Sequence, residues 1–355
     1  MPVTVLASVE RDVAIGSLAL DSGFALDDIV QRVTIYGEPR ADGSNVVLVP
    51  HALTGSSRVA EWWAGLVGPG KLFDPARLAV IGINALGSCY GSTGPATLAA
   101  DGRPYGSRFP VVGVGDLVRA QRVALSRLGI ERVAAVVGGS LGGMQALQWA
   151  LDAPEGCGHA VVVGAYDHFS AMGIALNAIA REAVRLDPNF RGGDFYDGSP
   201  PASGIELARK IAMLTYKSEA LLSTRFGRRP DRNGGDPRRT PWDMYDVEGY
   251  LAHQARAFSE RMDANAYLTL TRAMDLFETR ERELPPRLPA LTFVGVSSDW
   301  LFLPRLVEAA ADRFARAGAD SRYLELQTDH GHDAFLAEPA ALAALLAPHL
   351  ETLLR

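Results

Sequence analysis

The sequence predicts an α/β fold: a mostly parallel central sheet with helices on both faces and an inserted helical lid domain. Short, continuously apolar runs alternate with stretches of helical spacing in the first half of the chain. Parallel strands buried on both faces, joined by crossover helices, produce this alternation. The alternation stops after Gly164 and resumes near residue 290. We therefore expect the intervening residues to cover the sheet rather than extend it.

Each element follows from its own local pattern. The first half predicts strands at residues 33–36, 46–49, 78–83, 133–137 and 160–163, with helices at 115–128 and 144–151. The later part predicts helices at residues 171–186, 205–215, 247–262 and 264–277, then strands at 291–296 and 322–326 and a helix at 339–353. On this basis, residues 1–165 and 288–355 form the core and residues 166–287 form the lid insertion.

Composition narrows the class of protein. A chain of 355 residues with 48% hydrophobic and 21% charged residues is typical of a soluble globular protein with a large core. A net charge of −6 argues against nucleic acid as the main partner. Two cysteines, Cys89 and Cys157, do not form a disulfide framework and suit a reducing compartment. We therefore expect a cytoplasmic protein.

No membrane attachment is expected from the sequence. Charged residues at positions 10–12 interrupt the N-terminal apolar stretch, which argues against a signal peptide. The most apolar stretch, residues 133–151, contains Ser140, Gln145 and Gln148. A buried strand, turn and helix explain this stretch better than a membrane span does.

Ser140 is the first candidate for chemistry. It stands in Gly138-Gly139-Ser140-Leu141-Gly142, between a predicted strand and a predicted helix. The pattern G-x-S-x-G in this setting is a nucleophile elbow, in which a tight turn exposes the serine hydroxyl at a strand end. Taken alone, the five letters also fit a plain strand-to-helix turn. An elbow further predicts an acid and then a histidine later in the chain.

Both later residues are present at strand ends. Asp299 follows the strand predicted at 291–296, where a carboxylate can point into a cleft at the edge that holds the elbow. A surface turn aspartate is the alternative. His332 follows Gly331 after the next strand and precedes an apolar helix start, and His330 is its rival. We prefer His332 because of its Gly-His-Asp-Ala-Phe setting.

Proton affinities assign the roles. A serine hydroxyl is a poor nucleophile, so His332 would take the proton of Ser140 during attack. Asp299 would fix the histidine tautomer and stabilise its cation. The oxyanion that forms needs preorganised N–H donors. We expect these from Leu141, the residue after the nucleophile, and from Leu53 in an early loop.

The early loop also contains a histidine. His51 lies in Pro50-His51-Ala52-Leu53-Thr54-Gly55, directly after the strand predicted at 46–49. A catalytic base should follow the nucleophile in this architecture, whereas His51 precedes it. We therefore interpret His51 as a residue that shapes the loop.

Several longer motifs together resemble the homoserine O-acetyltransferase family, over about residues 15–340. They are residues 51–55, 84–89 with 91–95, 138–145, 187–190, 272–275 and 331–336. The resemblance implies an α/β-hydrolase core with a helical lid. It also implies transfer of an acyl group from acyl-CoA to the homoserine hydroxyl, usually for methionine biosynthesis. Ser140, Asp299 and His332 would be the catalytic triad.

The resemblance assigns two further residues. Arg209 would bind the substrate carboxylate, and Asp333 would bind the substrate ammonium. The planar fork of an arginine matches a carboxylate bidentately, which agrees with the first assignment. Without the resemblance, Arg209 would be interpreted as a helix-surface cation and Asp333 as a helix N-cap. The resemblance also implies a homodimer.

The chemistry implied is a ping-pong reaction through an acyl-serine. The donor is acetyl-CoA or succinyl-CoA as a co-substrate, and no bound cofactor and no metal are expected. The acceptor is homoserine or serine, which differ by one methylene. An esterase and a non-catalytic binding protein are the alternatives from other classes. The arginine-rich residues 225–239 are expected to be a solvated loop rather than a site for the CoA phosphates.

Overall fold

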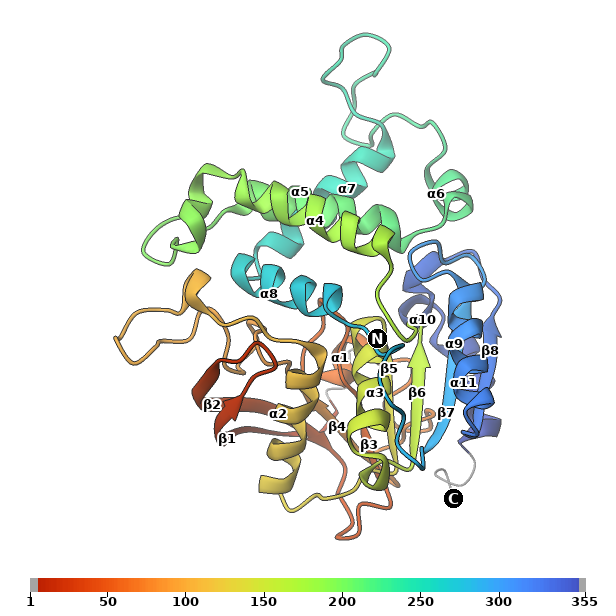
Figure 1. Cartoon of the computed structure of the whole chain (residues 1–355). Coiled ribbons are helices and arrows are strands. Elements are labelled where there is room, and N and C mark those ends of the chain that lie inside the picture. Colours follow the sequence, from red (N-terminus) through yellow and green to blue (C-terminus); the bar gives the residue numbers. More distant parts are fainter. Residues whose placement is uncertain (1–5, 351–355) are drawn as a thin grey trace.

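One sheet forms the centre of the protein in the computed structural model, which describes residues 6–350 (Figure 1). Its eight strands lie in the order β1-β2-β4-β3-β5-β6-β7-β8. Strand β2 pairs antiparallel with β1 and β4, and all pairs from β4 to β8 are parallel. The predicted mostly parallel sheet is thus confirmed. The strands are β1 (Val9–Ala19), β2 (Ala25–Tyr36), β3 (Val46–Leu48), β4 (Ala79–Ile83), β5 (Ala135–Gly139), β6 (His159–Val163), β7 (Ala290–Val296) and β8 (Ser321–Leu326).

Alternate side chains of the central strands supply two hydrophobic cores. Val136 and Val162 belong to one core, whereas Val137 and Val161 belong to the other. Both faces of these strands are therefore buried, which explains their continuously apolar sequences. Helices α2 (Val114–Arg127), α3 (Leu141–Asp152) and α9 (Pro304–Arg316) cover the first face, and α1 (Val59–Trp62), α10 (Ala334–Ala337) and α11 (Pro339–Leu346) cover the second.

Five helices between β6 and β7 lie beyond the carboxyl ends of the parallel strands (Figure 1). They are α4 (Ala171–Arg185), α5 (Ala202–Tyr216), α6 (Glu219–Phe226), α7 (Asp246–Ser259) and α8 (Ala264–Asp275). Residues 166–287, all of which are described, contain no strand. We interpret residues 166–287, which we call the helical segment, as an inserted lid over a core to which the described residues 6–165 and 288–350 belong.

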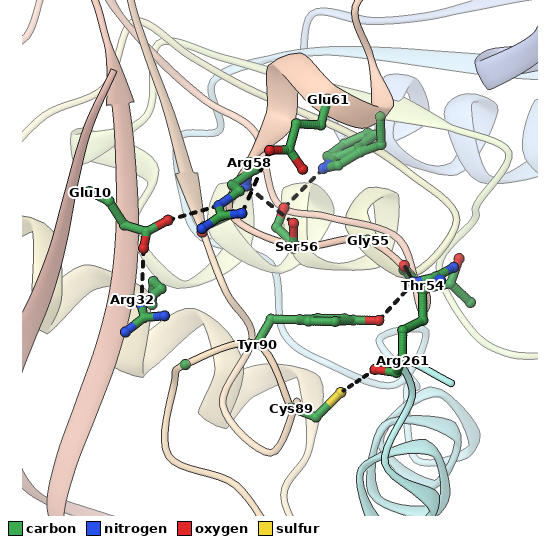
Figure 2. Close-up of a pocket in the computed structure, with 13 residues that line it drawn as sticks. Glu10, Arg32, Thr54, Gly55, Ser56, Arg58, Glu61, Cys89, Tyr90 and Arg261 are labelled. Carbon is green, nitrogen blue, oxygen red and sulfur yellow. Dashed lines mark hydrogen bonds and ion pairs between the residues drawn. The ribbon is translucent and has the colours of Figure 1, made fainter. Parts of the chain in front are cut away.

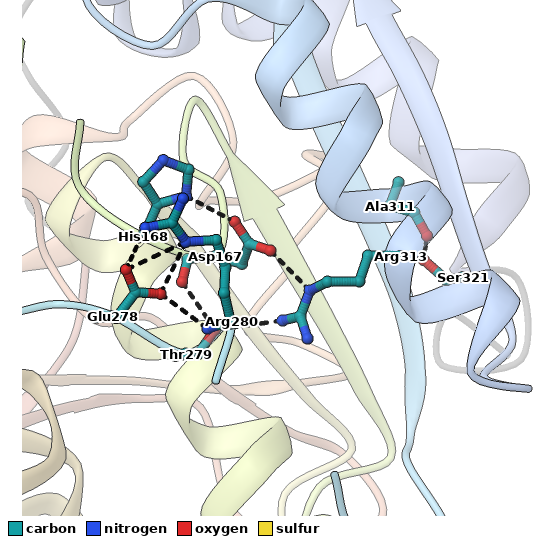
Figure 3. Close-up of polar contacts among 8 residues, drawn as sticks. All are labelled: Asp167, His168, Glu278, Thr279, Arg280, Ala311, Arg313 and Ser321. Carbon is teal, nitrogen blue, oxygen red and sulfur yellow. Dashed lines mark hydrogen bonds and ion pairs between the residues drawn. The ribbon is translucent and has the colours of Figure 1, made fainter. Parts of the chain in front are cut away.

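The two ends of the helical segment are tied together and to the core (Figure 3). His168 and Glu278 form an antiparallel bridge, and the Thr279 N–H donates to the Asp167 carbonyl at 2.9 Å. The Asp167 carboxylate accepts a hydrogen bond of 2.7 Å from Nε of Arg313, which lies on α9. The entry and exit of the segment therefore form one anchored junction.

Some elements differ from the sequence-based expectations. Strand β1 was not predicted. It is an edge strand whose first four residues are all exposed, and three of them are charged, so they do not show the apolar run of a buried strand. Helices α6 and α9 were also missed, and β2 begins at Ala25 rather than at residue 33. Helix α11 ends at Leu346, because Pro348 cannot continue the helical hydrogen bonds. The predicted helix end, residues 351–353, falls outside the described residues.

Five short 3₁₀ helices lie among residues 6–350: η1 (Gly106–Arg108), η2 (Pro154–Gly156), η3 (Pro188–Gly193), η4 (Gly331–Asp333) and η5 (Ala347–His349).

Across residues 6–350, every helix is too short or too polar to span a bilayer.

Candidate active site

Ser140 occupies the turn between β5 and α3, as the elbow pattern predicts. Its backbone is in the left-handed region, with φ 58° and ψ −124°. A non-glycine residue held there costs about 1–3 kcal/mol, so the surrounding structure must enforce the turn. The Ser140 N–H donates to the Val163 carbonyl at 2.9 Å, and its carbonyl accepts from the Met144 N–H at 3.0 Å. These bonds fix the serine at the carboxyl end of β5.

Two glycines make the turn possible. A Cβ atom at Gly138 would lie 2.2 Å from the Gly142 carbonyl oxygen, and one at Gly142 would lie 2.3 Å from the Pro50 carbonyl oxygen. Neither distance is compatible with a side chain. The glycine at position 142 also lets residues 50–55, which follow β3, approach the start of α3. The elbow and the early loop are therefore in direct backbone contact.

His332 and Asp299 form a buried pair. His332 Nδ1 lies 2.6 Å from Asp299 Oδ2, and each residue is only 2% exposed. Asp299 Oδ1 accepts from the backbone N–H groups of Leu301 and Phe302 at 2.9 and 2.8 Å. These two donors fix the carboxylate, so it presents its other oxygen to the imidazole. The histidine Nδ1 therefore carries a proton.

The net electrostatic environment favours the His332 cation. Burial by itself lowers the pKa of His332, but the attraction and hydrogen bond of Asp299 outweigh it, so the pKa is raised. The Phe302 ring stacks on the imidazole at 4.9 Å between centroids. Nε2, on the far side of the ring from Asp299, is buried and has no hydrogen-bond partner among residues 6–350. This nitrogen is available to accept a proton.

The imidazole lies at the same sheet edge as Ser140. A Cβ built on Gly164 would lie 3.2 Å from His332 Cε1. Gly164 directly follows Val163, whose carbonyl binds the Ser140 N–H. No hydrogen bond joins Ser140 Oγ to His332 Nε2 among the described residues. Such bonds in unliganded enzymes are often long and tighten only when substrate binds.

His330, the rival histidine, lies elsewhere. Its Nδ1 is 2.6 Å from Glu338 Oε1, and its side chain is 37% exposed. It makes no contact with Asp299 in the described part of the chain. The structure thus brings Asp299 together with His332 and not with His330.

The two expected N–H donors face no protein acceptor. Across residues 6–350, neither the Leu53 nor the Leu141 N–H has a hydrogen-bond partner. Leu53 lines a cavity together with Ser140. An oxyanion site requires free backbone donors close to the nucleophile, and one of these two follows Ser140 in the chain while the other belongs to a residue of the same cavity.

His51 holds the early loop in place. Its Nε2 accepts from the Ala85 N–H at 2.9 Å, so its Nδ1 carries the proton that the Ala52 carbonyl accepts at 2.7 Å. Burial lowers the pKa of His51 to about 4, which keeps the ring neutral. Gln145 on α3 donates to the His51 carbonyl at 3.3 Å. His51 therefore connects the Leu53 loop, the loop after β4 and the elbow helix.

The other side of this loop contacts the helical segment (Figure 2). Arg261, between α7 and α8, donates from Nη1 to the Thr54 carbonyl at 3.0 Å and to the Tyr90 hydroxyl at 2.7 Å. The pocket there has a volume of about 520 Å³ and is also lined by Arg58 and Glu10. Those two side chains pair with each other at 3.0 Å. The pocket is thus a surface site whose charges are largely compensated.

The cavity above Ser140 is small and apolar. It measures about 30 Å³, room for one or two waters. The sheet edge supplies Leu53, Ser140 and Leu301, and the helical segment closes the opposite side. The residues of the segment that line it are Phe169, Leu176, Asn177, Ala180, Ile211, Ala212, Thr215, Tyr216, Tyr267 and Met274.

Arg209, on α5, has a buried guanidinium with unused donors. Its Nε and Nη1 have no hydrogen-bond partner among residues 6–350. The guanidinium carbon lies 4.8 Å from the Phe258 ring centroid and 5.4 Å from that of Tyr216. The Tyr216 ring in turn lies 5.9 Å from the His332 ring. The Tyr216 ring thus lies close to both the guanidinium and the imidazole.

Asp333 has a partner that the sequence did not indicate. Lys217, just after α5, places Nζ 2.8 Å from Asp333 Oδ2, and both side chains are mostly buried. No local pattern marks Lys217, because it is a single lysine after a helix end. The pair joins the helical segment to the residue that follows His332.

Comparisons with known proteins identify the family of the chain. Residues 45–339 match the family model described as alpha/beta hydrolase fold. The chain is 39% identical over 358 residues to homoserine O-acetyltransferase of Moorella thermoacetica, covering 95% of this chain and 94% of the relative. It is 42% identical over 356 residues to homoserine O-acetyltransferase of Caulobacter vibrioides, covering 93% and 91%. It is 41% identical over 359 residues to homoserine O-succinyltransferase of Bordetella pertussis, covering 95% and 86%.

Solved structures share the fold. Homoserine O-acetyltransferase from Bacillus anthracis has a TM-score of 0.88 at 23% identity, covering 98% of each chain. Esterase E22 has a TM-score of 0.86 at 24% identity, covering 95% of this chain and 98% of the other. At these identities the likeness concerns the fold alone. The identities near 40% over most of the chain go further: the protein belongs to the homoserine O-acetyltransferase family, whose core is an α/β-hydrolase fold.

Proposed function

We propose that this protein is an O-acyltransferase that moves the acetyl group of acetyl-CoA to the hydroxyl of L-homoserine. The observation that carries the proposal is the buried His332–Asp299 pair, which lies at the same sheet edge as Ser140. The Tyr216 ring lies next to this histidine and next to the Arg209 guanidinium, two of whose nitrogens have no partner among residues 6–350. The pair suits acyl transfer. The guanidinium suits an acceptor that carries a carboxylate.

The first half-reaction forms an acyl-enzyme. His332 Nε2 takes the hydroxyl proton as Ser140 Oγ attacks the thioester carbonyl carbon. The N–H groups of Leu53 and Leu141 stabilise the resulting oxyanion. The C–S bond then breaks, the imidazolium returns its proton to the sulfur, and CoA leaves as a thiol. Asp299 stabilises the imidazolium throughout.

The second half-reaction runs the same chemistry on an alcohol. His332 Nε2 deprotonates the homoserine hydroxyl, whose oxygen attacks the acyl-serine carbonyl carbon. The bond to Ser140 Oγ breaks, and the serine recovers its proton from His332. Water would give hydrolysis at this stage, so the helical segment that closes the cavity favours transfer. The net result is O-acetyl-homoserine with a free enzyme.

The amino-acid acceptor needs two charged partners. We assign its carboxylate to Arg209, whose Nε and Nη1 have no hydrogen-bond partner among residues 6–350. Either atom, together with Nη2, offers the two parallel N–H groups that a carboxylate accepts. We assign its ammonium to Asp333. Because Lys217 already holds one oxygen of that carboxylate at 2.8 Å, the ammonium would use the other oxygen or displace the lysine.

The donor assignment rests on the charges beside the base. A succinyl group carries a free carboxylate and would need a cation near Ser140. Lys217 lies next to the residue that follows His332, but Asp333 compensates its charge. The cavity lining is otherwise apolar or uncharged, which suits an acetyl group. Succinyl transfer remains the second candidate, because the Bordetella pertussis relative carries that name.

A donor-by-acceptor matrix tests the proposal. Acetyl-CoA and succinyl-CoA are each combined with L-homoserine, with L-serine and with no acceptor, and thiol release is followed. We expect rapid turnover only with acetyl-CoA and homoserine. Fast CoA release without an acceptor would identify an esterase instead. Ser140→Ala should lose activity with every pair, and full activity in that variant would refute the acyl-serine.

We also propose a homodimer. Met172 and Ile179 on α4 and Leu186 directly after it are spaced seven residues apart and are 43%, 54% and 74% exposed. The neighbouring α5 exposes Leu207 and Leu214 at 50% and 45%. Apolar side chains in such a stripe suit a protein interface. Sedimentation velocity should give a dimer, and Ile179→Glu should shift it to a monomer; a monomeric wild type would refute the proposal.

A further inference from the structure

A second, open cavity of about 470 Å³ lies between α4 and α8, two of the helices that also close over Ser140. Helix α4 contributes Arg181, Glu182 and Arg185 to its lining, and α8 contributes Arg272. Three cations and one anion leave the lining with an excess of two positive charges. Its chemistry therefore differs from that of the apolar cavity above Ser140.

These arginines are poorly compensated by protein groups. Arg185 has no ion pair or hydrogen bond among residues 6–350. Arg181 pairs through Nη2 with Asp275 at 2.6 Å, but its Nη1 is buried without a hydrogen-bond partner. Arg272 reaches Asp275 only at 3.4 Å. Arginines that line one cavity and are only partly paired are suited to an anion with several oxygens.

Most arginines of the other surface cluster pair with nearby carboxylates, and none of them lines a cavity described for residues 6–350. In the arginine-rich loop of residues 225–239, Arg238 and Arg239 pair with Asp236 and Arg232 pairs with Asp246. That loop therefore fits the solvated surface expected from the sequence. The cavity between α4 and α8 is the better candidate for an anion.

A chain of hydrogen bonds joins this cavity to the one above Ser140. Asn177, which lines the Ser140 cavity, donates to Asp275 Oδ1 at 2.9 Å. The other oxygen of Asp275 holds Arg181, which lines the cationic cavity. Asp275 thus stands between the two cavities. Asn177, Asp275 and Arg181 therefore form the wall that the two cavities share, and a donor held by its anionic end at the arginines would have to extend its acyl end past this wall to reach Ser140.

We propose that the cavity lined by Arg181, Arg185 and Arg272 binds the phosphate groups of the acyl-CoA donor. The inference rests on the proposed function, since acyl-CoA is the only substrate there that combines an acyl group with phosphates. Phosphate oxygens accept bidentate hydrogen bonds from guanidinium groups. The site thus contributes to donor binding and has no part in the chemistry at Ser140.

Donor kinetics test the site. Arg185→Gln, Arg272→Gln and the double variant are compared with the wild type, using homoserine as acceptor. Both side chains are exposed, so neither change should impair folding. We expect KM for acetyl-CoA to rise about three- to tenfold for each arginine, with kcat within twofold. With p-nitrophenyl acetate, an acyl donor without phosphates, the variants should equal the wild type.

The control is Arg127→Gln, which removes an exposed arginine from the last turn of α2; this side chain has no ion pair with any described residue. It should change neither donor's KM. A double variant whose KM for acetyl-CoA stays within twofold of wild type would overturn the site and leave the proposed function intact. Equal losses of activity with acetyl-CoA and with p-nitrophenyl acetate would also overturn the site, because the arginines would then support the folded structure rather than bind phosphates. Should the wild type fail to transfer acetyl groups, calorimetric titration with CoA decides: equal affinity in wild type and double variant rejects the site.

Discussion

Replacing Asp299 by asparagine isolates the contribution of the acid to catalysis. In the native protein Asp299 Oδ1 accepts from two backbone N–H groups, and Oδ2 faces His332 Nδ1 at 2.6 Å. In Asp299→Asn the amide oxygen would keep the two backbone donors. The amide NH₂ would then face Nδ1, where two donors cannot meet. The imidazole must move its proton to Nε2, which can then no longer act as a base.

The magnitude follows from this tautomer switch. In serine hydrolases the corresponding change lowers kcat by about 10⁴-fold, or roughly 5.5 kcal/mol, because the base carries its proton on the wrong nitrogen. We expect a loss of about 10³- to 10⁴-fold here. The pKa of His332 is raised in the native protein chiefly through Asp299. Activity in the native enzyme should therefore rise with pH through a value above the usual 6.5 of histidine, where the base becomes neutral.

Thiol release from acetyl-CoA with homoserine, measured from pH 5 to 9, gives the loss in kcat and the pH at which the activity of the native enzyme rises. Circular dichroism shows whether the variant stays folded. The matched control is Asp329→Asn, an exposed carboxylate three residues before His332. It should keep wild-type rates and the wild-type acidic limb. An Asp299→Asn enzyme within tenfold of wild type would refute the assigned role of the acid.

Three further predictions concern the acceptor site, the elbow and acid stability. Arg209→Gln should raise KM for homoserine about 10- to 100-fold, from loss of charged hydrogen bonds worth about 1.5–3 kcal/mol, while the single-turnover rate of acyl-serine formation stays unchanged; a normal KM for homoserine would remove Arg209 from the site. Gly142→Ala would place Cβ 2.3 Å from the Pro50 carbonyl oxygen, so we expect a loss of at least about 1–3 kcal/mol in unfolding free energy and a lower kcat; a wild-type melting temperature would contradict this. Burial lowers the pKa of His51 and of His159 to about 4, so both are neutral in the folded protein while the unfolded chain titrates near 6.5. The free energy of unfolding should therefore fall by up to about 1.4 kcal/mol per pH unit and per histidine between pH 6.5 and 4. Urea unfolding at a series of pH values measures this free energy, and its decrease with falling pH should be smaller in His159→Gln than in the wild type.

The sequence predicted well whatever depends on local pattern or chain order. The parallel strands were recognisable because both faces are buried and the runs are apolar throughout. Ser140 was recognisable because two flanking glycines are sterically required. Asp299 and His332 follow from the rule that side chains after successive parallel strands meet at one sheet edge, and the structure places them 2.6 Å apart. The catalytic roles themselves stay predictions.

Contacts between distant, polar positions could not be predicted. The Lys217–Asp333 pair joins residues 116 positions apart, and neither stands in a distinctive pattern. The chain from Asn177 through Asp275 to Arg181 needs two helices side by side, and the sequence does not state which helices meet. Edge strand β1 was missed because half of its surface faces solvent and its residues resemble those of a loop. In each case tertiary packing, rather than local preference, decides the outcome.

The left-handed backbone of Ser140 has a consequence for the evolution of this protein. Glycine adopts φ 58° without strain, so the fold on its own would be more stable with glycine at this position. Selection for stability and selection for catalysis therefore oppose each other at one residue. A lineage that abandoned the reaction would be expected to lose this serine early, and its glycine-bearing descendants would melt at a higher temperature than their active ancestor.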